Sequence, residues 1–170
     1  MRRRAVLVVD VGTESVRAAL VGEEGRILAL ESKSLEFFSP YPGWAEQSPE
    51  EWFSAACTCM EGVLKRSAEV EVLALGVSAQ MHAVVPVDGR GELLLSRVPI
   101  WCDKRSDEVC RRIHEILPPE EQIERTANLL IPNWLAPKMR WIREHFPEVY
   151  AKTSCFLAAK DYLNFRFTGA

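Results

Sequence analysis

The chain has 170 residues, a length typical of one domain that buries roughly 70% of its unfolded surface. Hydrophobic residues make up 48% and charged residues 26%, which are ordinary fractions for a soluble globular protein. The net charge of −3 gives no overall basic field that would favour nucleic acid or an anionic membrane. Any phosphate-bearing ligand would therefore have to be held by local groups.

The cysteines and the N-terminus indicate a cytoplasmic protein. The five cysteines match no zinc-binding spacing, and their mostly apolar neighbours predict small core residues in a reducing compartment. The basic start is followed by an apolar run of only residues 5–9, which Asp10 ends. Since this run is too short for a signal peptide or a membrane span, we expect no membrane partner.

The first part of the chain predicts a three-stranded meander. Strands are expected at about residues 5–9, 15–21 and 26–34, and a turn is expected at residues 22–25. The proline-rich residues 39–43 then break regular structure.

A strong helix start follows at Ser48. Ser48 can cap the helix, Pro49 suits the first helical position, and apolar residues at helical spacing extend it to about residue 67. Trp44 is expected to pack against this helix as a hydrophobic staple, with Glu46 and Gln47 in a surface loop.

The second half predicts alternating strands and helices. The nearly all-apolar residues 72–77 indicate a buried central strand. Residues 84–95 predict a hairpin around a turn at 88–91. Three further helices are expected, at residues 106–117, 137–146 and 161–168, the last ending at Gly169. This order predicts an α/β domain with a mixed sheet flanked by helices.

Residues 10–17 are the first candidate ligand site. The strand-end carboxylate of Asp10 can hold Mg²⁺, and the turn containing Gly12 and Thr13 offers N–H groups and a hydroxyl to phosphate oxygens. Arg17 can add a cation. Since GxxxxGK[ST] and GxGxxG are absent, a nucleotide would have to bind here. An ordinary hairpin is the alternative.

Gln80, Met81 and His82 form the second candidate site, just after the apolar strand. The carboxyl end of a strand is where α/β sheets place ligands, and Gln and His offer donors and acceptors to hydroxyl groups. The alternative is that His82 caps a strand end and Met81 fills the core.

Trp101, Asp103 and Arg105 form the third candidate site. An aromatic face beside an Asp/Arg pair suits a sugar, whereas a core Trp with a solvated charge pair is the alternative. Asn133-Trp134 and Lys138 lie before a predicted helix and fit packing plus a solvated charge equally well.

The order of six segments is more specific than any one of them. DxGTxSxR, GWxEQxPxxWF, QMH, WxDxR, PxxxxPKxxW and KDYLxxxxTG, in this order, resemble the FGGY family of carbohydrate kinases over essentially the whole chain. Within the family the chain is most similar to xylulose kinases. The string Asp-Val-Gly-Thr-Glu-Ser-Val-Arg also resembles ribulose kinases, which leaves the sugar open.

The resemblance implies the actin-like, ribonuclease H-like ATPase fold, with two lobes around a cleft. Residues 1–170 would be an incomplete N-terminal domain that lacks the C-terminal lobe. ATP and Mg²⁺ would be the cofactors and a ketopentose, D-xylulose first, the substrate. The implied phosphate-binding residues are Asp10, which also holds the metal, Gly12, Thr13 and Arg17. The implied sugar-binding residues are Gln80, Met81, His82, Trp101, Asp103 and Arg105, with a weaker contact at Asn133 and Trp134.

The same resemblance implies that the catalytic residue is missing. The general-base Asp and the adenosine pocket would lie beyond residue 170, so the chain alone is expected to be inactive and to need the C-terminal lobe as its partner. An isolated sugar-binding module, an actin-fold ATPase acting on something other than sugar, and a homodimer are left open.

Overall fold

The structure is a computed structural model that describes residues 3–170, and these divide into two compact units. Unit 1 comprises residues 3–37, 48–80 and 159–170, and unit 2 comprises residues 38–47 and 81–158. Unit 1 is thus assembled from three separate stretches of the chain. Across the described residues, none of the helices combines the length and apolar character that a membrane crossing needs.

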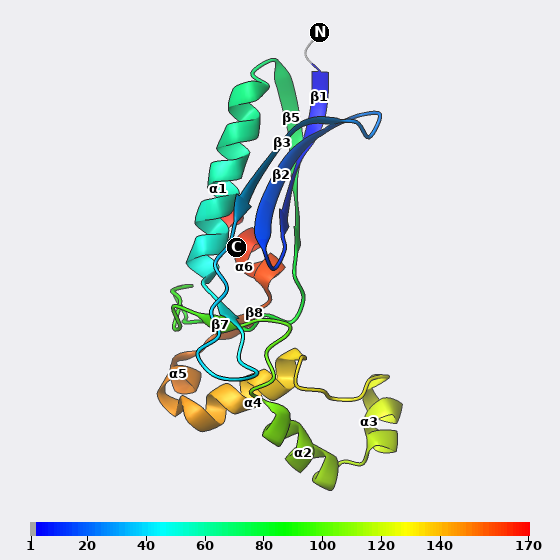
Figure 1. Cartoon of the computed structure of the whole chain (residues 1–170), viewed down its shortest axis with the longest axis vertical. Helices are drawn as coiled ribbons and strands as arrows, with labels where there is room; N and C mark the ends of the chain where they lie inside the picture. The colour runs from blue at the N-terminus through cyan, green and yellow to red at the C-terminus, as the bar shows by residue number, and fades with distance from the viewer. Residues whose placement is uncertain (1–2) are drawn as a thin grey trace. The chain divides into compact units, whose positions relative to one another are not determined.

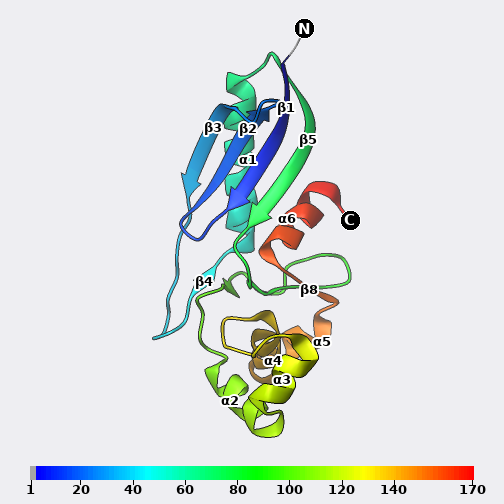
Figure 2. The same cartoon turned by 90° about the vertical axis from the view of Figure 1, so that its right-hand side faces the viewer.

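A four-stranded mixed sheet forms the centre of unit 1 (Figure 2). Its order is β3-β2-β1-β5, with β1–β2 and β2–β3 antiparallel and β1–β5 parallel. The strands are β1 (Arg3–Val11), β2 (Ser15–Gly22), β3 (Ile27–Ser34) and β5 (Val70–Ala79). The predicted meander is therefore confirmed.

Helix α1 (Pro49–Arg66) packs along one face of this sheet (Figure 1). Alternate residues of β1 and β2 are buried, as period-2 side chains on a half-covered sheet should be. The predicted start of the helix is confirmed, since Ser48 Oγ accepts a hydrogen bond from Glu51 N at 3.4 Å.

Helix α6 (Ala159–Thr168) completes unit 1 from the other end of the chain. Tyr162 and Leu163 are fully buried, and the Tyr162 hydroxyl donates to the Glu50 carboxylate of α1 at 3.3 Å. Arg166 donates to both groups. Gly169, with a φ of 76°, ends the helix as predicted. The KDYL segment therefore ties α6 to α1.

Strand β5 differs from its prediction as a buried central strand. It is an edge strand: β1 pairs with one side, and within residues 3–170 no strand pairs with the other. Val72, Leu73 and Leu75 are exposed, Leu73 by 46%. An apolar run indicates that both faces of a strand can be buried. It does not specify whether other segments of the protein pack against those faces.

Unit 2 consists of short strands and four helices around its own apolar core. Strand β4 (Glu46–Gln47) pairs with β7 (Val98–Pro99), and β6 (Val85–Val87) pairs with β8 (Cys155–Leu157). The helices are α2 (Asp107–Ile116), α3 (Pro119–Thr126), α4 (Leu135–His145) and α5 (Pro147–Lys152). One buried apolar cluster of this unit comprises Val84, Val109, Trp141 and Ile142.

The predicted hairpin at residues 84–95 is only partly present. Its turn forms, since Gly91 N donates to Asp88 O at 3.0 Å. Residues 92–95 make a single bridge, between Val87 and Leu93, and the actual partner of β6 is β8. Helices α3 and α5 and strands β4, β7 and β8 were not predicted, because each is too short to show a period.

Candidate functional site

The turn between β1 and β2 favours glycine at position 12. Gly12 N donates to Ser15 O at 2.9 Å, and a Cβ at Gly12 would lie 3.3 Å from that same oxygen. A side chain at this position would therefore crowd the Ser15 carbonyl oxygen. Glu14 is exposed, and its carbonyl oxygen accepts from Leu35 N at 2.9 Å. The turn therefore has a defined backbone shape at the end of β1.

Asp10 and Arg17 lie side by side beside this turn. They are register partners across β1 and β2, and Ser78 of β5 pairs with Asp10 on its other side. Directly paired residues project from the same face of a sheet. Their neighbours Val9 and Val11 are fully buried on the opposite face, which α1 covers. Asp10, Arg17 and Ser78 thus share the face away from α1.

The Asp10 carboxylate is available to a cation. Within residues 3–170 it makes no side-chain hydrogen bond or ion pair, and no cluster of three potential metal ligands forms in that range. A single carboxylate suits Mg²⁺ that keeps waters and takes its other ligands from phosphate oxygens. The residues present therefore fit a metal bound together with a nucleotide, and do not fit a metal held by protein alone.

His82 has the most unusual environment in unit 2. Its φ of 60° lies in the left-handed region, which is uncommon for a residue other than glycine. Its ring stacks on Trp134, with centroids 5.1 Å apart and planes at 24°. Nδ1 is buried and lacks a hydrogen-bond partner among the residues described. Burial and, secondarily, the nearby Lys138 charge lower the pKa of His82. A neutral imidazole is therefore held ready for a ligand hydroxyl.

The other residues around this segment differ in exposure. Gln80 ends unit 1 after β5, with its backbone N–H bonded to Val11 O at 2.7 Å. Met81 is 66% exposed, so the alternative that it fills the core is wrong. Trp101 is 42% exposed, and its carbonyl oxygen accepts from Asn133 Nδ2 at 2.9 Å. Asn133 therefore connects the Trp101 segment to the one that carries Trp134.

Asp103 and Arg105 form a buried clasp. The fully buried Asp103 carboxylate accepts hydrogen bonds from Ala45 N at 2.7 Å and Arg105 Nη2 at 2.8 Å, and from Arg105 N and Nε at 2.9 Å. Arg105 Nη2 also donates to Glu46 Oε1 at 2.7 Å, and its guanidinium lies 3.7 Å from the Trp44 ring centroid.

The clasp overturns the alternative of a solvated charge pair beside Trp101. Four accepted hydrogen bonds use the full capacity of the Asp103 carboxylate. The geometry gives Asp103 and Arg105 a positioning role, holding the segment of Ala45 and Glu46 to the one that follows Trp101. Direct sugar contacts by these two residues stay predictions.

Three residues of this region have roles that sequence reasoning missed. Trp44, expected to staple the first helix, packs within unit 2 against Trp141 at 5.3 Å and beneath Arg105. Glu46 is an ion-pair partner of Arg105, and Lys138 is fully buried. Their presence in the motif segments GWxEQ and PKxxW was the available signal.

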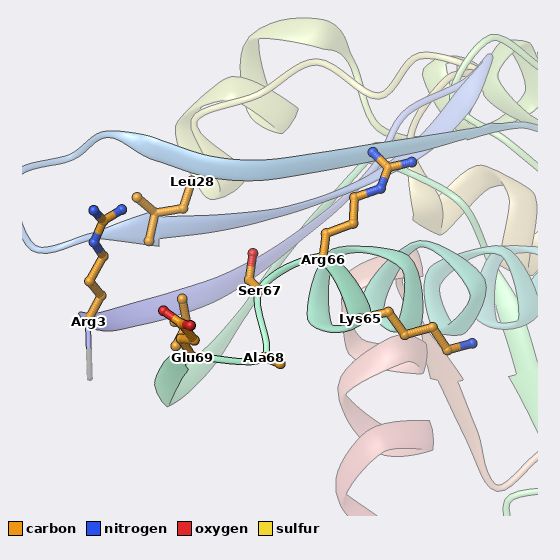
Figure 3. Close-up of a pocket in the computed structure, with 8 residues that line it drawn as sticks. Arg3, Leu28, Lys65, Arg66, Ser67, Ala68 and Glu69 are labelled. Atoms are coloured by element: carbon orange, nitrogen blue, oxygen red, sulfur yellow. The ribbon is translucent and has the colours of Figure 1, made fainter. Parts of the chain in front are cut away.

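A sizeable hollow lies elsewhere, at the opposite end of unit 1 (Figure 3). Its volume is about 840 Å³, and it sits near the start of β1, whereas Asp10 is near the end of that strand. It contains none of the predicted site residues. Its basic side chains Lys65 and Arg66 are paired with Glu61 and Glu31. The lining residues are Arg3, Leu28, Lys65, Arg66, Ser67, Ala68, Glu69 and Val70.

Comparison with known proteins identifies the family. The model of the FGGY family of carbohydrate kinases, N-terminal domain, matches residues 5–170. The chain belongs to this family. Two of the similar proteins are named xylulose kinase, one from Escherichia coli (33% identical, covering 95% of this chain) and one from Klebsiella pneumoniae (34% identical, covering 95%). The chain spans 33% of the length of each.

Solved structures confirm the fold that the FGGY resemblance implied. Xylulose kinase from Rhodospirillum rubrum superposes with a TM-score of 0.90 at 27% identity, covering 95% of this chain and 33% of that one. Glycerol kinase from Plasmodium falciparum gives a TM-score of 0.93 at 22% identity, covering 99% and 35%. The α/β fold with a mixed sheet is the actin-like ATPase fold of this family.

Proposed function

We propose that this chain is the N-terminal part of a cytoplasmic, ATP-dependent kinase that phosphorylates a ketopentose, with D-xylulose as the first candidate. The observation that carries the sugar half of the proposal is the buried Nδ1 of His82, which has no hydrogen-bond partner in the described part of the chain. His82 lies in the same unit as the exposed Trp101. The names of the similar proteins support the choice of sugar.

In this proposal the β1–β2 turn binds the phosphates of ATP. Backbone N–H groups of the turn and the Thr13 hydroxyl face phosphate oxygens, and Arg17 adds positive charge. Asp10 holds Mg²⁺, which when bound neutralises charge on the phosphate that is transferred. Gly12 keeps the turn in this shape, because a Cβ there would lie 3.3 Å from Ser15 O.

The sugar lies against the His82 and Trp101 side chains of unit 2. His82 Nδ1 accepts a hydrogen bond from a sugar hydroxyl, and the Trp101 ring covers the apolar C–H groups. Gln80 and Met81 add further contacts. Asp103 and Arg105 keep the Trp101 segment in place through the clasp.

The remaining chemistry belongs to a second lobe of the same polypeptide. A general-base Asp that takes the hydroxyl proton and an adenosine pocket would complete the site, and lobe closure would exclude water. We therefore expect the 170-residue chain to show no sugar-dependent ADP formation.

Activity of the full-length protein tests this function. We expect ATP-dependent phosphorylation of D-xylulose, with D-ribulose and L-ribulose as the competing substrates to compare by kcat/KM. Trp101→Ala should raise the sugar KM at least tenfold. Tyr150→Ala, which removes a ring of similar exposure from α5, should leave it unchanged. If the full-length protein hydrolyses ATP but phosphorylates none of these sugars, the proposal is refuted, and an ATPase with another substrate is favoured.

Calorimetric titration of D-xylulose into the 170-residue chain tests the alternative of a separate sugar-binding module. A saturable signal that is lost in His82→Ala would show that the half-site binds sugar without catalysis. No signal, combined with an active full-length enzyme, would show that sugar binding needs both lobes.

A further inference from the structure

Lys138 lies completely buried in the first turn of α4, and its ammonium donates to three backbone carbonyl oxygens. The acceptors are Ile100 O and Asn133 O, both at 2.7 Å, and His82 O at 2.9 Å. An ammonium has three protons, so its donor capacity is matched by these acceptors. Lysine is seldom fully buried unless it is paired, which makes this arrangement unusual.

Each of the three carbonyls belongs to a segment that carries an aromatic or imidazole ring of the proposed sugar site. His82 provides one carbonyl itself, Ile100 precedes Trp101, and Asn133 precedes Trp134. The segments also contact one another, through the His82–Trp134 stack and the Asn133–Trp101 hydrogen bond. A single positive charge therefore joins three loops that are distant in sequence.

Of the three hydrogen bonds, the one to the His82 carbonyl oxygen has the clearest structural purpose. The left-handed backbone of His82 is disfavoured for an L-residue with a Cβ and persists only where surrounding contacts hold it. The hydrogen bond from Lys138 fixes the direction of the carbonyl in that conformation, and with it the direction of the ring.

We propose that Lys138 is a positioning residue for sugar binding, whose charged ammonium sets the relative placement of His82, Trp101 and Trp134. This role rests on the proposed function. Lys138 has no donor left for the sugar, so it acts only through the three carbonyls it binds. Removing its charge should therefore weaken sugar binding and leave ATP binding unchanged.

The charged and titratable groups that face the ammonium define its pH range. These are Asp103, which favours the charged form, Arg105, which opposes it, and the Cys102 thiol and His82 ring. Burial is the largest effect and lowers the pKa of Lys138 to about 8. The ammonium is thus charged at neutral pH and loses its proton in mildly alkaline solution.

The contribution of Lys138 to stability and the affinity for sugar should change in opposite directions above pH 8. Because the folded pKa is lower than the unfolded one, the folded state binds the proton less tightly, and the contribution of this group to stability rises with pH. A neutral amine donates one hydrogen bond fewer, so the three loops lose part of their tie. If Lys138 only stabilised the fold, loss of its proton would leave the sugar KM unchanged.

The test compares the full-length wild type with Lys138→Met and Lys138→Arg. We expect Lys138→Met to raise the sugar KM at least tenfold with an ATP KM changed less than twofold, and Lys138→Arg to recover part of the loss. In the wild type, the ratio of sugar KM to ATP KM should rise several-fold between pH 7.5 and 9.5 (the interval spanning that pKa of about 8). Lys152→Met, an exposed charge on α5, is the control.

Distinct results separate the two proposals. An active wild type whose Lys138→Met variant keeps the sugar KM would overturn the role of Lys138 alone. A wild type that phosphorylates no sugar would overturn the proposed function. If Lys138→Met does not fold, the pH dependence of the wild type decides, and a flat ratio of the two KM values would overturn the inference.

Discussion

The ring of His82 stacks on the indole of Trp134, while its buried Nδ1 has no hydrogen-bond partner within residues 3–170. Stacking fixes the plane of the imidazole, and Nδ1 in that plane can accept a hydrogen bond from a ligand. The pair therefore presents a rigid acceptor to a ligand, and acidification should disable it.

Acid should destabilise the protein through His82. Its pKa is lowered below the ordinary 6.5, so the unfolded chain binds the proton more tightly than the folded one. The contribution to stability is present above pH 6.5 and is lost as the pH falls toward the folded pKa. We expect His82→Asn, which tolerates the left-handed backbone, to reduce the fall in unfolding free energy between pH 7 and 5. Urea titrations at pH 7 and pH 5 measure this difference in unfolding free energy for the wild type and the variant.

His145→Asn is the control for the acid effect, because His145 is solvent-exposed and its ring stacks on Trp141 rather than on Trp134. A pH dependence that is equal in the wild type and in His82→Asn would contradict the assignment to His82.

Loss of the Asp103 carboxylate should be among the most damaging single changes. Asp103→Ala would leave the Arg105 guanidinium, whose side chain is only 3% exposed, without its main partner. Breaking a buried ion pair typically costs about 3–5 kcal/mol of unfolding free energy. Asp107→Ala removes an exposed partner of Arg111 and should cost about 0.5 kcal/mol or less. Denaturant unfolding of both variants measures the contrast, and equal costs would show that the clasp is not a stabilising element.

Gly12→Ala should weaken nucleotide binding more than folding. The added Cβ would press on Ser15 O at 3.3 Å and shift the turn that presents the N–H groups. We expect the ATP KM of the full-length protein to rise at least tenfold while the sugar KM stays within twofold. Gly89→Ala is the matched control, because among residues 3–170 no heavy atom beyond its chain neighbours lies within 4 Å of the new Cβ. An unchanged ATP KM in Gly12→Ala would count against phosphate binding at this turn.

The open edge of β5 should make the 170-residue chain prone to self-association. Unpaired edge strands with exposed apolar side chains are templates for pairing with another copy. Leu73→Lys places a charge on this edge and should lower the fraction of dimers and aggregates seen by light scattering. Ile116→Lys, at an exposed position on a helix, should have a smaller effect. If both substitutions reduce association equally, the edge is not its cause.

Local sequence signals predicted the elements that depend on local physics. The cap at Ser48, the meander and the glycine stop at Gly169 follow from turn chemistry and periodicity, and all three are confirmed. The pairing of β6 with β8 and the exposure of β5 depend on chain far away in sequence, so no local pattern could reveal them.

The candidate site shows the same division. The motif segments located His82, Trp101 and Asp103, because their residue types suit a sugar. The clasp and the Lys138 contacts join segments up to 59 residues apart, as between Glu46 and Arg105. A charged residue before a helix fits solvent equally well in sequence, and only the converging carbonyls show that Lys138 is buried.

Assembly of unit 1 from both ends of the chain has a consequence during synthesis. The ribosome releases β1, β2, β3, α1 and β5 first, but Tyr162 and Leu163 emerge only after residues 81–158 have been made. At roughly 5–20 residues per second, the nascent sheet waits on the order of 4–16 s for α6. Throughout that interval the apolar surface that α6 covers is open to chaperones, while unit 2 is free to fold before unit 1 is complete.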